Sequence, residues 1–152
     1  LHACDTATDH ALAFGILQKS DFIAVAPCCQ AELANAWKKM SGPSLSHHLS
    51  VLINSAELRR DSAATFTDAV RLLLLRACGY EAHSGEFVPS QHTPKNRLIT
   101  GVRRGNFHKP SFQEYENFLE SSGSPTLTLP TLLQEHLKQL FGRVATQTQA
   151  QT

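Results

Sequence analysis

A strand–helix–strand pattern near the start of the chain constrains its fold more than any other feature. The segment Phe22–Ala26 is continuously apolar and is followed by Pro27, which is typical of a strand buried on both faces of a parallel sheet. Before it, Asp9–Gln18 carries apolar residues at helical spacing, and Leu1–Cys4 has the character of the end of a buried strand. A helix that connects two such strands predicts an α/β fold.

The length and composition indicate one ordinary globular core. The chain has 152 residues, of which 41% are hydrophobic and 18% charged, and its formal net charge is +1. This charge is too small to indicate a nucleic-acid binder by itself, and no apolar run is long enough to span a membrane. The four cysteines are not spaced like a disulfide scaffold, so we expect reduced thiols in a cytoplasmic protein.

The rest of the sequence predicts one long helix, a pair of strands and several shorter helices. The strongest helical pattern is Asp61–Cys78, which ends at Gly79. Two predicted strands, Tyr80–Val88 and Arg97–Arg104, are separated by an eight-residue loop and can pair antiparallel. Weaker patterns predict helices at Gln30–Met40, Ser111–Ser121 and Leu132–Phe141, and a short helix or turn at His47–Ile53.

These patterns divide the chain into three parts. We expect residues 1–104 to be the C-terminal part of an α/β enzyme domain, residues 105–145 a helical extension, and residues 146–152 a disordered tail rich in Gln and Thr. Because the first residues have the character of a strand end with nothing before it, we expect the chain to be a fragment of a larger enzyme.

Two loops that follow predicted strands carry polar and sulfur-containing side chains. Asp5 and Thr6 follow the first strand, and Cys28 and Gln30 follow the second. Neighbouring strands joined by a crossover end at the same edge of a sheet, so we expect these groups to share one rim. The rim is expected to contain His2, Cys4, Asp5, Pro27, Cys28, Cys29 and Gln30.

Several chemistries are compatible with this rim. It can bind a substrate or a cofactor, or the cysteines can be small core residues while Asp5 and Thr6 only cap helices. Cys and His side chains also bind zinc and iron–sulfur clusters, although the chain has no Cys-x-x-Cys pair. Cys28 or Cys29 at a helix N-terminus can be an activated nucleophile. The residues alone leave these alternatives open.

The loop between the two late strands is a second candidate region. Pro94 restricts its backbone, Lys95 carries a positive charge, and the side chain of Asn96 can bind the backbone or a ligand. The structural alternative is a well-formed turn with a solvated lysine.

Three separated blocks of sequence resemble one family of enzymes. The blocks are residues 2–9 (HACDTATD), 26–33 (APCCQAEL) and 86–96 (EFVPSQHTPKN), and they occur in the family's order. They are similar to S-adenosylmethionine-dependent methyltransferases of the bacterial branch related to the eukaryotic methyltransferase-like 25 proteins. A more distant similarity is to the tRNA 2′-O-methyltransferases. The resemblance covers about residues 1–104.

The resemblance implies a Rossmann-like sheet of seven strands. Leu1–Cys4 would end the fourth strand, Phe22–Ala26 would be the fifth, and the two late strands would form a closing antiparallel hairpin. It also implies S-adenosylmethionine as the methyl donor, with RNA as the favoured acceptor and a small molecule as the alternative.

The chain departs from the family in two respects. The Gly-rich loop and the acidic residue that hold the donor in such enzymes are not among these residues, so we expect the chain alone to bind the donor poorly or not at all and to be inactive. The family usually carries Glu where this chain has Gln91.

The resemblance also implies roles for individual residues. An acceptor hydroxyl or nitrogen can need a general base. The expected catalytic base is Asp5, with His2 as the second candidate. The expected donor-binding residues are Cys4, Thr6 and Asp9. The expected acceptor side consists of Pro27, Cys28, Cys29, Gln30, His92, Thr93, Lys95 and Asn96.

Different functions would place different groups at the rim. An RNA methyltransferase would present Lys95, Arg97 or Arg103 there and would bind RNA in a salt-dependent manner. A small-molecule enzyme would close the helices of Ala31–Ile53 over an apolar pocket. A metal-binding or non-enzymatic α/β protein is the third interpretation, and no set of metal ligands is assigned.

Overall fold

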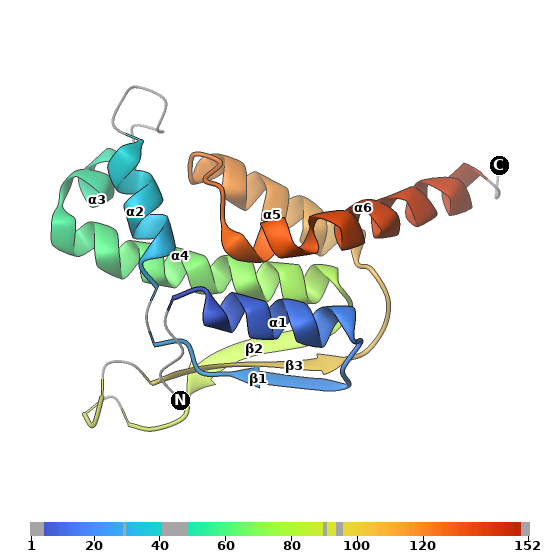
Figure 1. Cartoon of the computed structure of the whole chain (residues 1–152), viewed down its shortest axis with the longest axis horizontal. Helices are drawn as coiled ribbons and strands as arrows, with labels where there is room; N and C mark the ends of the chain where they lie inside the picture. The colour runs from blue at the N-terminus through green and yellow to red at the C-terminus, as the bar shows by residue number, and fades with distance from the viewer. Residues whose placement is uncertain (1–4, 29, 41–48, 90, 94–95, 150–152) are drawn as a thin grey trace.

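The computed structural model of the chain describes residues 5–28, 30–40, 49–89, 91–93 and 96–149, with side chains as far as residue 140. The first helix is followed by one strand, three helices and a pair of strands, and two helices close the chain (Figure 1). In order, the elements are α1 (Ala7–Leu17), β1 (Phe22–Val25), α2 (Glu32–Lys39), α3 (Ser50–Asn54), α4 (Ala56–Ala77), β2 (Tyr80–Glu86), β3 (Arg97–Arg103), α5 (Lys109–Ser121) and α6 (Thr128–Gln149).

The described strands form one sheet in the order β1-β3-β2. β3 lies in the middle and is antiparallel to both neighbours, with Phe22 opposite Val102 and Tyr80 opposite Arg103. The predicted antiparallel pairing of the two late strands is therefore confirmed, as is the mixed α/β class. The expected strand Leu1–Cys4 lies outside the described residues.

The helices of the described chain lie on one side of this sheet (Figure 1). Ile23, Ala82 and Ile99 point to that side and are buried in the core. On β1 the burial alternates, and the side chain of Phe22 is 60% exposed. The expectation of a strand buried on both faces is therefore wrong for the described residues, because helices cover only one of the two faces.

Helix α4 is the long helix that the sequence predicts, and it packs against β2 and β3 of the sheet. Its buried face repeats at helical spacing through Ala63, Val70, Leu74 and Ala77. The helix begins at Ala56, earlier than expected, and its last turn is closed at Gly79, whose φ is +89°. Only glycine adopts this conformation without strain, so the sharp turn into β2 depends on it.

The C-terminal helices pack onto the same core. Helix α5 lies against α4 and α6 against α1, and Leu129 and Leu133 of α6 are fully buried. The side chain of His108 accepts a hydrogen bond from the backbone N–H of Ser111 and so caps α5. Helix α6 runs from Thr128 to Gln149, so it is longer than expected and covers part of the 146–152 segment that the composition predicts to be disordered. Within the described residues, no helix is both long enough and apolar enough to cross a membrane.

Candidate functional site

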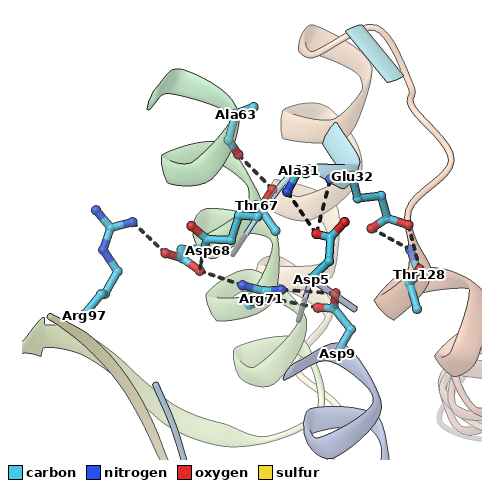
Figure 2. Close-up of polar contacts among 11 residues, drawn as sticks. Asp5, Asp9, Ala31, Glu32, Ala63, Thr67, Asp68, Arg71, Arg97 and Thr128 are labelled. Carbon is cyan, nitrogen blue, oxygen red and sulfur yellow. Dashed lines mark hydrogen bonds and ion pairs between the residues drawn. The ribbon is translucent and has the colours of Figure 1, made fainter. Parts of the chain in front are cut away.

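Asp5 joins the loop before α1 to the loop after β1. Its carboxylate oxygen Oδ1 accepts hydrogen bonds from the backbone N–H groups of Ala31, at 2.9 Å, and Glu32, at 3.3 Å (Figure 2). A carboxylate at this position satisfies amides at the start of α2 and interacts favourably with the positive end of the helix. The two loops that were expected to share a rim therefore meet through Asp5, which caps α2 rather than the helix that follows it.

Of the expected donor-binding residues, Thr6 and Asp9 are described, and both take part in contacts within the fold. Thr6 occupies the N-cap position of α1, yet its side chain makes no capping hydrogen bond; its backbone carbonyl accepts from the N–H of His10 at 3.0 Å. Asp9 is only 3% exposed, and both of its carboxylate oxygens are bound by Arg71. This pairing favours a role for Asp9 in holding α1 to α4.

Arg71 is the centre of a buried ionic network beneath the rim (Figure 2). Its Nε and Nη2 donate to Asp9 at 2.8 and 3.1 Å, and its Nη1 donates to Asp68 at 2.9 Å. Burial alone would lower the pKa of Arg71, but the hydrogen bonds and charges of Asp9 and Asp68 raise it above its usual value. The guanidinium therefore stays charged although its side chain is 1% exposed.

Asp68 extends the network to the rim and to the sheet. Its Oδ2 accepts from Nη1 of Arg97, the first residue of β3, at 2.6 Å. Its Oδ1 accepts from the side-chain amide of Gln30, which follows β1. Two carboxylates are thus matched by two guanidinium groups, the arrangement that makes burial of charge tolerable. We call these residues, Asp9, Gln30, Asp68, Arg71 and Arg97, the Asp68 network.

The expected acceptor-side residues fall into distinct environments. Pro27 is buried and Cys28 is half-buried. Asn96 is buried, and its side-chain amide donates to the carbonyl of Val88 at 2.8 Å, which ties the β2–β3 loop closed. His92 is exposed and Thr93 half-buried. The remaining expected site residues, His2, Cys4, Cys29 and Lys95, lie outside the described residues.

A hollow of about 610 Å³ opens beside Asp5 and Thr6. We call it the α2 hollow because α2 contributes more of its lining residues than any other element. The turn between α5 and α6 contributes another part, so the C-terminal extension borders the loop that contains Asp5. The lining residues are Asp5, Thr6, Glu32, Asn35, Ala36, Lys39, Met40, Ser124, Pro125 and Thr126.

The α2 hollow has polar and charged groups beside the apolar side chains of Ala36, Met40 and Pro125. Asp5 uses one oxygen to cap α2, and Glu32 accepts from both the N–H and the hydroxyl of Thr128, at 3.1 and 2.6 Å. Lys39 is the cation of the lining, and Asn35 brings an amide that both donates and accepts. Across the described residues, no three His, Cys, Asp or Glu side chains gather into a group that could hold a metal ion.

Comparison with protein families finds a match at the start of the chain. Residues 1–36 match a family model described as a methyltransferase domain. This stretch contains Asp5, α1, β1 and the first part of α2, and hence both loops of the rim. No curated protein and no solved structure was found to match the chain. The match supports methyltransferase activity as the general class of function.

Proposed function

We propose that this chain provides the acceptor side of an S-adenosylmethionine-dependent methyltransferase whose methyl acceptor is RNA. One observation carries the proposal: the stretch similar to a methyltransferase domain, residues 1–36, holds the two loops that meet through Asp5 beside the α2 hollow. In α/β sheets, ligands bind outside the carboxyl ends of strands. The loop of Gln30 follows β1, and we propose that the loop of Asp5 follows the strand expected at Leu1–Cys4.

The sheet can form one edge of a Rossmann-like sheet, in which further strands pair with β1. Among the described residues β1 pairs only with β3, so its second edge can accept another strand, and the sheet face of Phe22 is not covered by a helix. The sequence contains no Gly-rich donor loop. We therefore assign the binding of the donor's nucleoside part to strands added at the β1 edge, and the methyl-accepting end to this chain.

The reaction is an in-line displacement. The acceptor oxygen or nitrogen forms a bond to the methyl carbon while the carbon–sulfur bond breaks, and the electron pair of that bond stays on sulfur as a neutral thioether. The acceptor proton passes to a base or to water. Holding the reacting atoms in line can lower the barrier by roughly 7–11 kcal/mol in ideal systems. We propose Asp5 as the base, because its second carboxylate oxygen is not used in capping α2.

The lining of the α2 hollow favours RNA over an apolar small molecule. A pocket closed by apolar side chains was the expectation for a small-molecule enzyme, whereas Lys39, Asn35 and Thr126 give this hollow a charge and hydrogen-bonding groups. We also propose a cytoplasmic location, which is supported by four cysteines that are not spaced like a disulfide scaffold.

Calorimetry tests the proposal. S-adenosylmethionine is titrated into the 152-residue chain and, in parallel, into the protein with whatever residues its gene encodes before Leu1. Binding to the longer form, with weak or no binding to the shorter one, is the expected result, and it would be followed by transfer of a labelled methyl group to cellular RNA. Absence of binding to both forms would overturn the proposal.

A further inference from the structure

Helix α2 is hydrogen-bonded to the loop of Asp5 at its N-terminus and to the C-terminal helices through its own side chains. Asp5 caps its N-terminus, as described above. The indole Nε1 of Trp37 donates to the backbone carbonyl of Ser122 at 2.9 Å, and Glu32 receives the two hydrogen bonds from Thr128. The segment between Ser122 and Thr128 is therefore held against α2 at each end, which fixes the wall that it provides to the α2 hollow.

The turn itself has a defined backbone. Gly123 and Ser124 both have positive φ, at +90° and +50°, and the N–H of Ser124 donates to the carbonyl of Leu119 at 2.9 Å. Positive φ at a serine costs energy and is seen where the surroundings determine the conformation. This conformation directs the next residues, Pro125 and Thr126, into the lining of the hollow.

The charged groups of the hollow are two carboxylates, Asp5 and Glu32, and one cation, Lys39. Asp5 lies at the N-terminus of α2 and Glu32 at the N-terminus of α6, where backbone amides and helix dipoles stabilise negative charge. Lys39, in the last turn of α2, is exposed and takes part in none of the ion pairs found among the described side chains. The hollow thus offers a cation next to an amide, hydroxyl groups and the apolar surface of Pro125.

We propose that the α2 hollow binds one nucleotide of an RNA acceptor and that the α5–α6 turn selects that nucleotide. This inference rests on the proposed function and names the substrate group that the hollow takes. A volume of about 610 Å³ lies in the range of small-ligand pockets. Lys39 contacts the phosphate, Asn35 and Thr126 bind the base edge, and Pro125 supports the ring of the base.

Binding of a fluorescein-labelled single-stranded RNA, followed by anisotropy at several salt concentrations, tests the inference. The variants are Lys39→Ala and Asn35→Ala, with Lys38→Ala as the control, because Lys38 lies on the same helix and carries the same charge but does not line the hollow. We expect Lys39→Ala to weaken binding about tenfold and to reduce the salt slope by about one. Asn35→Ala should weaken binding without changing the slope, and Lys38→Ala should resemble the wild type.

The fold of each variant is checked through Trp37, which is the only tryptophan and is fully buried on α2. Unchanged emission shows that α2 keeps its contact with the turn. Equal losses for Lys39→Ala and Lys38→Ala, or no RNA binding by the wild type, would overturn the inference. Neither result would change the binding of S-adenosylmethionine that calorimetry measures. Failure of the RNA site can therefore be distinguished from failure of the methyltransferase proposal.

Discussion

Arg71 binds both carboxylate oxygens of Asp9, although the two residues lie 62 positions apart in the sequence. The contact joins α4 to α1, and through Asp68 the same guanidinium reaches Gln30 at the rim. A bidentate pair is geometrically specific as well as strong. The loops of the candidate site are thus positioned by charges that lie in the core, below the surface where a ligand would bind.

Removing the guanidinium should destabilise the protein severely. In Arg71→Met, the carboxylates of Asp9 and Asp68 lose their shared partner in a buried environment, and the expected loss in the free energy of unfolding is about 3–5 kcal/mol. Urea denaturation followed by Trp37 fluorescence measures it. Asp61→Asn, an exposed change on the same helix, should stay within about 0.5 kcal/mol of the wild type. Similar stabilities for the two variants would show that the network contributes little.

Two glycines provide a matched test of backbone strain. At Gly79, φ is +89° and an added Cβ would collide with the backbone oxygens of Gly105 and Asn106, so Gly79→Ala should lower stability by about 1–3 kcal/mol or more. At Gly85 an added Cβ meets nothing within 4 Å and φ is not positive. Gly85→Ala should therefore be nearly neutral. Thermal denaturation of both variants measures the difference in stability. Equal melting temperatures would refute the structural role of Gly79.

The thiol of Cys78 should resist alkylation in the folded protein. Burial raises its pKa from 9.0 to about 12, so almost no thiolate exists at pH 8. Iodoacetamide labelling with peptide mapping should find Cys78 unmodified until the chain is unfolded by urea, whereas the half-buried Cys28 should be modified earlier. Rapid modification of Cys78 in the folded protein would contradict its burial.

The same raised pKa predicts a dependence of stability on pH. The folded protein holds the thiol proton more tightly than the unfolded chain, so this contribution is complete below about pH 9 and is lost as the pH rises toward about 12. Tyr115, whose pKa burial also raises to about 12, acts in the same direction. Urea denaturation across this range should show falling stability, with a smaller slope in Cys78→Ala. An unchanged slope in that variant would show that Cys78 does not contribute to the pH dependence of stability.

Most of the elements could be predicted from apolar spacing, because spacing reports which side of an element is buried. It indicated α1, β1, the long helix α4 and the two late strands. It could not indicate what covers the second face of the sheet, so Phe22 was expected to be buried and is exposed. Apolar spacing also underestimated the length of α6. The first turn of this helix depends on a hydrogen bond from Thr128 to Glu32, 96 residues earlier in the chain.

The candidate site could be predicted only in part. The meeting of the two loops followed from the crossover rule, which is a property of neighbouring strands. The Asp68 network was missed, although Asp68 and Arg71 stand three residues apart within an apolar helical face, and this spacing was the available signal. Their partners Asp9 and Arg97 come from other elements, and no local pattern shows which distant charge will compensate a buried one.

Asp5 allows the capping role to be separated from the proposed catalytic role. The side-chain oxygen of Asn accepts the same backbone hydrogen bonds, and Asn tolerates the φ of +50° found at this position, so Asp5→Asn should keep stability within about 0.5 kcal/mol. Asn cannot accept the acceptor's proton, so methyl transfer should fall about 10²–10⁴-fold if Asp5 is the base. Asp5→Ala should lose the cap as well, at a further cost of about 0.5–2 kcal/mol.

The decisive comparison is methyl transfer and melting temperature measured on the same two variants, in the form of the protein that binds S-adenosylmethionine. A slow but stable Asp5→Asn supports a direct role in proton transfer, because the cap on Ala31 and Glu32 is intact. An Asp5→Asn variant that transfers methyl groups at the wild-type rate would show that Asp5 acts by capping α2. In that case the acceptor proton leaves to water or to another group, and the contribution of the rim is to hold the acceptor in line.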